Sequence, residues 1–430
     1  MEAYLSFRVG QRACSGGSCT GSDGTAGQAG WSCGNAAPRL HLGVTGSIAA
    51  YRAPDLVRQW QDAGLSVSVT LTAAAQKFIT PLTFTALGAA PVYTSLFDDP
   101  QAPSPFAHLE PGQVAQALVI APASASTLAR LAQGQADEIL ACQTLAFRGR
   151  PVIAPAMNPA MWSNPATQAN IATLRSRGYA VVEPGWGRTA CGEEGQGRLA
   201  DLREIYLAGL CALAPQDMRG MRVLVTLGPT REHWDGLRYW TNPSTGAMGA
   251  SIAVAAWMRG ARVEAICGPG TLWLPSGIVR HDVDSAREMF ETASDLWPQC
   301  DAGVFTAAVA DFSPEPAGDA AHKFKKSSAP DGFSIRFIPN PDILKTLSLS
   351  RRPEQKVIGF AAESMDLETS VRGKLVSKKA DLVVGNLIRD GFGTADNTVF
   401  VADASGREER WTHLSKPDVA WRLLSWLLSR

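Results

Sequence analysis

From His41 to the C-terminus, short runs of β-branched and aliphatic residues alternate with longer amphipathic stretches. This alternation is typical of a parallel sheet whose strands are joined by crossover helices, and it predicts an α/β fold. In the first half of the chain, the apolar runs predict strands over residues 40–45, 66–71, 117–120, 151–154 and 179–182.

Characteristic start and stop residues delimit the helices between these strands. One helix is predicted over residues 54–63, because Gly64 follows it and glycine is favoured directly after a helix. Asn164 and Pro165 form an N-cap followed by a proline at the first helical position. They predict a helix over residues 165–177 that ends at Gly178.

The pattern lapses around residues 212–220, where the chain runs through Ala, Pro, Gln, Asp, Met, Arg and Gly. A fresh strand begins at Arg222 and leads into a Gly-Pro turn. The sequence therefore predicts two domains, over residues 39–214 and 222–430, with a linker over residues 215–221.

The second domain repeats the α/β pattern, with strands expected near Arg222, Arg262, Gly303, Lys356 and Asp381. One helix is expected after Ser244, and Trp421, Leu424 and Leu428 mark one face of a closing helix. Both domains are predicted to be doubly wound open sheets. Such sheets bind ligands beyond the carboxyl ends of their strands.

Composition and charge narrow the classes of function. A chain of 430 residues that is 45% hydrophobic can form two separate cores. Lys and Arg together number 40, as do Asp and Glu, so no global field attracts nucleic acid or an anionic membrane surface. No apolar run reaches the roughly 20 residues that span a bilayer, and no leader peptide is evident. We expect a soluble, cytoplasmic protein.

Residues 1–38 are rich in Gly, Ser, Thr and Ala, and we predict a disordered extension or a misplaced start of translation. Cys14, Cys19 and Cys33 cluster there without a fourth ligand at zinc spacing, which leaves adventitious metal or redox chemistry as the alternative. The other cysteines are scattered and expected to be reduced: Cys142, Cys191, Cys211, Cys267 and Cys300.

Candidate chemistry in the first domain begins with the loop over residues 43–51, whose small residues would let backbone N–H groups meet a phosphate at a helix start. This signal alone is weak, since any nucleotide could satisfy it. Hydroxyl groups follow the next strands, at Thr72 and at Ser124, Ser126 and Thr127, where they could contact a ring or a ribityl chain. The alternative is that these hydroxyls cap helices.

Seven strings in the first domain resemble the phosphopantothenoylcysteine decarboxylases, which belong to the homo-oligomeric flavin-containing cysteine decarboxylase family. They are GVTGSIAAYRAP from Gly43, FITPLTF over residues 78–84, HLE from His108, APASASTLARLA from Ala121, PAMN ending at Asn158, NPATQANIATLRSRG from Asn164 and ACGEEGQGRL from Ala190. The resemblance implies a flavodoxin-like fold that binds FMN, with FMN near Gly46, Ser47, Thr72, Ser124 and Ser126.

The same resemblance places His108, Asn158 and Cys191 in the active site. Decarboxylating a cysteine-derived acid requires an electron sink, which oxidation of the thiol by a flavin provides. Cys191 would then donate a proton when the ene-thiol is reduced, from a glycine-rich flap. The alternatives are an inert core cysteine, a surface histidine at position 108 and a turn-capping Asn158.

The family usually has glycine where Ser47 stands, asparagine at the position of Ser126, and Leu-Ala in place of Pro111-Gly112. The first two departures are tolerable for FMN. The third is expected to change how the segment after His108 enters its helix.

Residues 222–428 resemble the phosphopantothenate–cysteine ligases and imply a Rossmann-like ligase domain. The matching strings are VTLGPTRE from Val225, RYWTNPSTG from Arg238, TAAVAD from Thr306, KFKK from Lys323, NPDI from Asn340, GFAAE from Gly359 and KLVSK from Lys374. Ser244, Thr245 and Gly246 open a helix and form a good phosphate cradle.

By this resemblance, the substrates are 4′-phosphopantothenate, cysteine and CTP, and Mg²⁺ assists formation of an acyl-cytidylate. Asn242 should hold the acyl intermediate, and Arg238 should lie near the substrate. The expected nucleotide residues are Asp311, Lys323, Asn340, Pro341, Asp342, Ile343, Phe360, Lys374 and Lys378. No residue is predicted to bind the metal. The lysines would balance the triphosphate charge, although each could instead be a solvated surface charge.

Two further departures concern the ligase motifs, where Leu227 replaces a small residue and Ala247 stands where lysine is common. The family forms trimers through its flavin half and dimers through its ligase half, so we expect a homo-oligomer. The competing hypotheses are a flavin prenyltransferase-like enzyme and a flavin-binding regulatory subunit. Neither explains the Cys191 flap together with residues 222–428.

Overall fold

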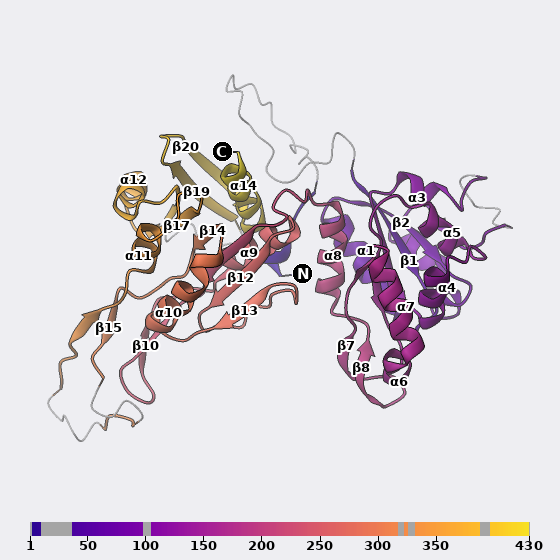
Figure 1. Cartoon of the computed structure of the whole chain (residues 1–430), viewed down its shortest axis with the longest axis horizontal. Coiled ribbons are helices and arrows are strands. Elements are labelled where there is room, and N and C mark those ends of the chain that lie inside the picture. Colours follow the sequence, from indigo (N-terminus) through magenta and orange to yellow (C-terminus); the bar gives the residue numbers. More distant parts are fainter. Residues whose placement is uncertain are drawn as a thin grey trace. The chain divides into compact units, whose positions relative to one another are not determined.

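The computed structural model describes residues 2–9, 37–97, 105–316, 322–325, 332–387 and 396–429. It contains two compact units (Figure 1). The first comprises Arg8–Pro215, and the second comprises Gln216–Arg430 together with Glu2–Phe7. Both units are α/β structures, so the predicted fold class is confirmed.

The first unit contains a parallel sheet in the order β3-β2-β1-β4-β5-β6. Leu42 at its centre lies opposite Val69 on one neighbouring strand and Val119 on the other. The strand order reverses between β1 and β4, which makes their carboxyl ends the ligand position of a doubly wound sheet. The strands are β1 (Arg39–Val44), β2 (Ser66–Leu71), β3 (Val92–Tyr93), β4 (Ala117–Ala123), β5 (Val152–Pro155) and β6 (Ala180–Val181).

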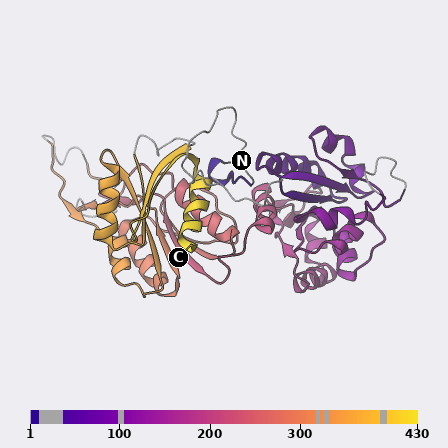
Figure 2. The ribbon, with the colours of Figure 1, turned by 90° about the horizontal axis from the view of Figure 1, so that it is seen from above.

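Helices cover both faces of this sheet (Figure 2). On one face, α1 (Ala53–Asp62) packs against α8 (Leu202–Leu213), and the Trp60 indole donates to the Tyr206 carbonyl at 3.1 Å. The other face shares one apolar core with α4 (Ala125–Gln133), α5 (Ile139–Ala146) and α7 (Pro165–Ser176). Shorter elements are α2 (Pro81–Ala86), α3 (Glu110–Val114), α6 (Pro159–Ser163) and the hairpin of β7 (Gly185–Arg188) with β8 (Glu194–Arg198).

The second unit has an eight-stranded sheet in the order β13-β12-β9-β14-β17-β18-β19-β20, antiparallel only at the last two pairings. The strand order again reverses at the centre, between β9 and β14. The strands are β9 (Arg222–Leu227), β12 (Arg262–Cys267), β13 (Val279–Asp282), β14 (Ala302–Phe305), β17 (Lys356–Glu363), β18 (Leu382–Leu387), β19 (Asp396–Asp403) and β20 (Glu408–Ser415).

The sequence pattern predicted five of these strands and missed β13, β19 and β20. Strand β13 exposes three of its four residues and β20 four of its eight, so they lack the apolar run that marks a buried parallel strand. Strand β19 gains its place from antiparallel pairing on both sides, which no local pattern shows.

Two helical layers enclose the second sheet. On one face, α10 (Ala286–Leu296), α11 (Ile343–Leu349) and α12 (Leu367–Lys378) share a core with it. On the other face, α9 (Ala247–Met258) packs against α14 (Lys416–Leu428), which explains why α9 is apolar nearly all round. The hairpins β10 (Arg231–His233) with β11 (Tyr239–Thr241), and β15 (Phe312–Pro314) with β16 (Phe337–Pro339), extend away from the main sheet (Figure 1).

The expectation of disorder over residues 1–38 is wrong for residues 2–9. A 3-10 helix spans Ala3–Leu5, and the side chains of Tyr4, Leu5, Phe7 and Val9 are buried. The helix packs against α9 and α14, and the Phe7 ring meets Trp421 edge to face at 6.5 Å. These apolar residues fold because the tertiary structure offers them partners. Residues 10–36, with Cys14, Cys19 and Cys33, lie outside the described part.

None of the described helices is long and apolar enough to cross a bilayer. In the described part of the chain, no disulfide joins any of the five cysteines Cys142, Cys191, Cys211, Cys267 and Cys300.

A buried polar group in the first unit predicts an acid-sensitive fold. The His41 ring lies between the hydroxyls of Ser68 and Thr70, at 2.8 and 2.9 Å. Burial lowers the pKa of His41 to about 3, although a hydrogen bond to Gln143 opposes the shift. Below pH about 6.5 the unfolded chain therefore takes up a proton that the folded chain refuses, and stability falls as the pH drops towards 3.

We expect this single group to lower the free energy of unfolding by about 2 kcal/mol between pH 7 and pH 5. The His41→Asn variant cannot titrate, so its loss over the same interval should be smaller by that amount. Denaturant titrations at both pH values measure the difference. Equal losses in the wild type and the variant would contradict the assignment.

Candidate functional site

The first site lies at the carboxyl ends of β1 and β4, where the strand order reverses. The hydroxyl of Thr45, the residue after β1, donates to the Pro122 carbonyl at 2.7 Å and accepts the Ser124 N–H at 2.8 Å. Thr45 is fully buried, so this pairing satisfies a group that water cannot reach. The two loops expected to meet a flavin are thereby fixed to each other.

The hydroxyls predicted to contact FMN serve local structure as well. Ser47 accepts the Ala49 N–H, Thr72 accepts the Ala75 N–H, and Ser124 accepts the Thr127 N–H. The capping alternative therefore accounts for these three, whereas Ser126 is exposed. A hydroxyl that accepts one bond at a cap still has a proton to donate to a ligand.

Gly46 and three exposed apolar side chains follow the strand ends at this edge of the sheet. A Cβ on Gly46 would lie 2.5 Å from the Cβ of Ala74, so the loops after β1 and β2 touch there with no room for a side chain. Ile48, Phe78 and Met161 follow the ends of β1, β2 and β5, and each exposes about half of its area (56, 50 and 49%).

Asn158 and Cys191 are brought together, as the resemblance implied. The Asn158 side-chain oxygen accepts the Ala160 N–H at 2.8 Å and caps α6, which fixes the orientation of the amide. Its nitrogen therefore faces the hairpin loop and donates to the Cys191 sulfur at 3.2 Å and to Glu193 at 2.8 Å. The turn-capping alternative for Asn158 is correct for the side-chain oxygen, whereas the side-chain nitrogen contacts Cys191 and Glu193.

The Cys191 sulfur has a second close partner in the Thr189 hydroxyl, at 3.1 Å. Hydrogen bonds from Thr189, from the Glu193 backbone and from Asn158 hold the pKa of the Cys191 thiol below its ordinary value. Thr189 also reaches the Glu193 carbonyl, at 3.0 Å. Its single proton can point to that carbonyl when Cys191 is a thiol, and to the sulfur when Cys191 is a thiolate.

The hairpin that carries Cys191 is anchored at its second strand. The Gly197 carbonyl accepts the Met157 N–H at 2.9 Å, and Gly197 has a φ of +155°. A Cβ there would lie 2.4 Å from the Met157 oxygen, so only glycine allows this approach. Cys191 itself is exposed in the loop between β7 and β8, which excludes the inert-core alternative.

His108 is half buried in the turn before α3, and the hydrogen bonds of Cys191 with Asn158 and Thr189 do not include it. In the described part of the chain, the partners of Cys191 are Thr189, Glu193 and Asn158.

Pro111 occupies the first turn of α3, where its missing N–H costs nothing. Gly112 lets α3 approach α5, since a Cβ would lie 2.4 Å from the Gln143 oxygen. The departure at these two positions thus fits the local packing.

In the second unit, two predicted asparagines bind one backbone segment after β14. Asn242 donates to the Val309 carbonyl at 3.1 Å, and Asn340 donates to the Ala310 carbonyl at 2.8 Å. The Asn340 N–H also donates to the carbonyl of Asp311, whose side chain is exposed. The segment over residues 308–311 therefore joins positions that are 98 residues apart in the sequence (340 − 242).

The lysines of α12 lie beside the same region. Lys374 donates to the Phe360 carbonyl at 2.6 Å, and burial together with the charge of Lys378 lowers the pKa of Lys374. Lys378 pairs with Asp342. Burial alone would raise the pKa of Asp342, but Lys378 and Lys345 together outweigh it and the pKa is lowered.

Pro341 is half buried, and Ile343 is only 5% exposed, within the core at the start of α11. Only the backbone of Ile343 could therefore face a nucleotide. The structure brings together the other predicted residues of this group: Asn242, Asp311, Asn340, Asp342, Phe360, Lys374 and Lys378.

Arg238 and Lys323 belong to a separate cluster, organised by the buried carboxylate of Asp235. Asp235 accepts the N–H groups of Leu237, Arg238 and Phe324 at 2.8, 2.7 and 3.0 Å, and the Arg238 guanidinium at 2.8 Å. Burial would raise the pKa of Asp235, but these donors outweigh it and lower the pKa. Arg238 thus neutralises a buried charge, in addition to any contact with substrate.

The same turn holds Lys323 from both sides. The carbonyl of His322 accepts the Gly236 N–H at 3.4 Å, and the N–H of Phe324 goes to Asp235. Trp234 packs against Phe324 and stacks on Phe333, with ring centroids 5.1 and 4.8 Å apart. The side chain of Lys323 is exposed, so its backbone is fixed while its ammonium group is accessible.

Sequence reasoning missed Thr189 and Asp235. Asp235 did carry a signal, because Asp followed by Gly favours a turn in which the carboxylate accepts N–H groups further along the chain. Thr189 carried none, since its contacts with Cys191 and Glu193 depend on how the hairpin loop folds.

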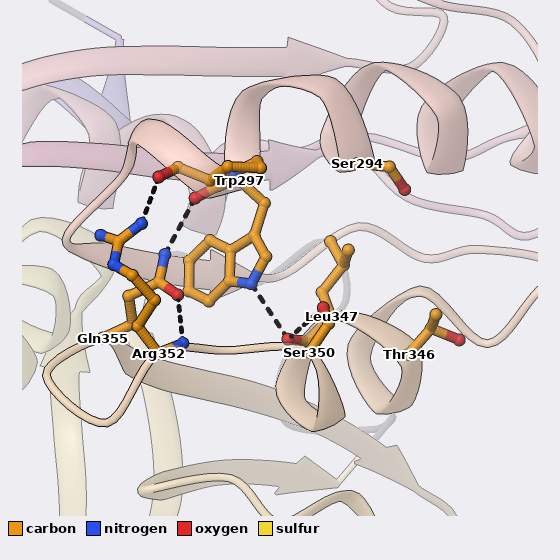
Figure 3. Close-up of a pocket in the computed structure, with 8 residues that line it drawn as sticks. Ser294, Trp297, Thr346, Leu347, Ser350, Arg352 and Gln355 are labelled. Atoms are coloured by element: carbon orange, nitrogen blue, oxygen red, sulfur yellow. Dashed lines mark hydrogen bonds between the residues drawn. The ribbon is translucent and has the colours of Figure 1, made fainter.

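A hollow of about 300 Å³ beside α10 and α11 contains none of the predicted residues (Figure 3). The Trp297 indole donates to the Leu347 carbonyl at 3.0 Å, and Gln355 donates to the carbonyls of Trp297 and Cys300 at 2.9 and 2.8 Å. Arg352 binds the carbonyls of Pro298 and Cys300. These polar groups hold two helix ends together.

In the part of the chain that the structure describes, no group of three His, Cys, Asp or Glu side chains could hold a metal ion.

Two family models match the chain. Residues 34–208 match the Flavoprotein family, and residues 218–430 match the C-terminal domain of DNA/pantothenate metabolism flavoproteins. Among solved structures, the chain is similar to the C-terminal domain of a coenzyme A biosynthesis bifunctional protein (32% identity, 50% of this chain and 97% of that one, TM-score 0.42). It is also similar to the FMN-dependent cysteine decarboxylase SpaF (34% identity, 41% and 98%, TM-score 0.36).

Three relatives are similar over both domains, and each is named Coenzyme A biosynthesis bifunctional protein CoaBC. The Vibrio vulnificus (strain CMCP6) protein is 39% identical over 87% of this chain and 93% of its own length. The Bacillus subtilis protein is 39% identical over 89% and 95%, and the Escherichia coli K12 protein is 37% identical over 85% and 90%. The chain therefore belongs to the family of coenzyme A biosynthesis bifunctional proteins CoaBC.

Proposed function

We propose that the chain catalyses two consecutive steps of coenzyme A biosynthesis. The second unit joins 4′-phosphopantothenate to cysteine, and the first unit decarboxylates the resulting phosphopantothenoylcysteine to 4′-phosphopantetheine. The observation that carries this proposal is the contact of Asn158 with Cys191, which places an amide donor and an acidic thiol on one surface. The relatives span both domains, so a prenyltransferase-like or regulatory protein is not favoured.

FMN is the flavin that we propose for the first unit. Gly46, Ser47, Thr72, Ser124 and Ser126 would hold it at the ends of β1, β2 and β4. When bound, it supplies a two-electron acceptor for the cysteine-derived part of the substrate. Ile48 and Phe78 would exclude water from that surface.

Cys191 supplies the proton in this scheme. Its sulfur is exposed, and its lowered pKa makes the thiol a better acid near neutral pH. After the proton leaves, Thr189, Asn158 and the Glu193 N–H can all donate to the sulfur, which stabilises the thiolate. Asn158 keeps the thiol beside the substrate. His108 would be a further residue of this active site, as the resemblance implies.

We propose CTP as the activating nucleotide of the second unit, with Mg²⁺ bound mainly through its phosphates. The ammonium groups of Lys323, Lys374 and Lys378 would offset the triphosphate charge. The carboxylate of Asp311 is exposed and could be a ligand of Mg²⁺ in addition to the phosphate oxygens. Asn242 would hold the acyl-cytidylate near the segment over residues 308–311. Ser244, Thr245 and Gly246 at the start of α9 would bind a substrate phosphate. We expect the working form to be a homo-oligomer.

The Cys191→Ser variant tests the proton donor. Serine replaces the thiol with a hydroxyl that is far too weak an acid, while the side-chain volume changes little. Loss of CO₂ precedes the step that needs this proton, so the variant should release CO₂ once and accumulate an ene-thiol. Mass analysis of a single turnover should find a product two hydrogens lighter than phosphopantetheine. Phosphopantetheine formed at the wild-type rate would assign the role elsewhere, with Glu193 and Glu194 the next candidates.

The Thr189→Val variant tests the cause of the lowered thiol pKa. Removing the hydroxyl deletes the hydrogen bond that contributes most to that shift, so the pKa of Cys191 should rise. The pH dependence of alkylation by iodoacetamide measures it, with Cys191→Ser as the blank for other cysteines. The midpoint should move to higher pH by a few tenths of a unit or more. An unchanged midpoint would show that Asn158 and the Glu193 N–H suffice.

The Lys323→Gln variant tests the separation of the two activities. It should lower ligation at least tenfold while decarboxylation of supplied phosphopantothenoylcysteine continues, because the two reactions use different units. Lys356→Gln, at the amino end of β17 and away from the carboxyl edge, is the matched control and should leave both activities intact. Equal loss of both activities in Lys323→Gln would indicate a folding role.

A further inference from the structure

The N-terminal segment lies outside both family matches, which begin at residues 34 and 218. Even so, Glu2–Phe7 is part of the second unit, and Leu5 is completely buried there. Its 3-10 helix packs against α9 and α14. This chain thus adds a short element to the unit that carries the ligase motifs.

Tyr4 connects this element to two parts of the unit. Its hydroxyl donates to the Trp273 carbonyl at 2.8 Å and accepts the Trp273 N–H at 3.1 Å, so one side chain satisfies both backbone groups of Trp273. Its own carbonyl accepts the hydroxyl of Ser251 at 2.9 Å, and Ser251 is a fully buried residue of α9. Tyr4 therefore ties the loop after β12 to the helix beside it.

Both of these parts border Gly246, the residue directly before α9. Gly246 has a φ of +72°, and a Cβ there would lie 2.9 Å from the Gly228 nitrogen and 3.1 Å from Leu272 Cδ1. Leu272 immediately precedes Trp273, and its carbonyl accepts a bond from Arg280 at 2.7 Å. Arg280 thus binds the loop after β12 at Leu272, and Tyr4 binds it at Trp273.

The same loop begins at an open surface. Pro269 and Gly270 line a hollow of about 350 Å³ at the carboxyl ends of β12 and β13. A loop with one end at such a hollow and Leu272 against Gly246 can move towards or away from the start of α9 unless it is anchored. The bonds from Tyr4 oppose that movement.

We propose that Tyr4 is a positioning residue of the ligase site, which sets the place of Leu272 against Gly246 and so the geometry of the phosphate cradle at Ser244, Thr245 and Gly246. This inference rests on the proposed ligase function. Backbone N–H groups at a helix start bind phosphate only when they converge on it, so a shifted loop weakens binding of a phosphate-bearing substrate.

The test is the Tyr4→Phe variant of the full chain, which removes the hydroxyl and keeps the buried ring. We expect the KM for CTP or for phosphopantothenate to rise at least threefold, with kcat changed less than twofold. The KM for cysteine and the decarboxylation of supplied phosphopantothenoylcysteine should not change. Phe7→Leu is the matched control, because Phe7 lies in the same segment but packs its ring against Trp421 of α14. It should lower thermal stability and leave every KM unchanged.

Hydrogen exchange gives a second readout that does not depend on activity. The amide of Trp273 and its neighbours over residues 269–275 should exchange faster in Tyr4→Phe than in the wild type or in Phe7→Leu. Unchanged KM values, or equal changes in the two variants, would overturn the proposal. If the wild type makes no phosphopantothenoylcysteine with any nucleotide, the proposed function fails instead. Hydrogen exchange over residues 269–275 then decides whether Tyr4 positions this loop.

Discussion

In each unit, a threonine hydroxyl joins the two central strands at the place where they part. Thr45 at the end of β1 donates to the Pro122 carbonyl in β4, and Thr306 after β14 donates to the Thr226 carbonyl in β9, at 2.7 Å in both cases. The chain leaves these strands in opposite directions, and in the second unit a single bridge between Pro229 and Ala308 continues the pairing beyond the threonine. A bond of this kind contributes only about 1 kcal/mol net, but removing the Thr45 hydroxyl would also leave the Ser124 N–H without its acceptor beside the site. The loop after β1 and the segment over residues 308–311 begin next to these threonines.

Polar side chains at these edges serve the fold and the chemistry together. Asn158 uses its oxygen to cap α6 and its nitrogen to hold Cys191 and Glu193. Asp235 accepts four donors and so fixes the backbone on both sides of an exposed lysine, Lys323. Because the capping bond determines which way each side chain points, the functional group is oriented before any ligand arrives.

The two units differ in what surrounds their sheets. The sheet of the first unit is covered by the unit's own crossover helices. The reactive thiol of this unit lies on the hairpin of β7 and β8, and that hairpin can approach Met157 closely only because residue 197 is glycine. The second extends its sheet with two antiparallel strands and covers α9 with α14 and with residues from the N-terminus. Helix α9 has no polar face, so it depends on these neighbours for burial.

The sequence by itself determined the α/β class, the division near residue 215 and the motifs at the strand ends, because apolar periodicity and glycine-rich turns are local signals. It also determined that Asn158 and Cys191 belong together, although only through their resemblance to a family. Tertiary structure decided the rest. Strand β19 forms because it pairs with β18 and β20. Ile343 is a core residue because α11 packs on the sheet. Tyr4 and Leu5 lie in a segment whose overall composition predicts disorder, yet they are buried because α9 and α14 offer an apolar surface that no local pattern in residues 1–38 encodes.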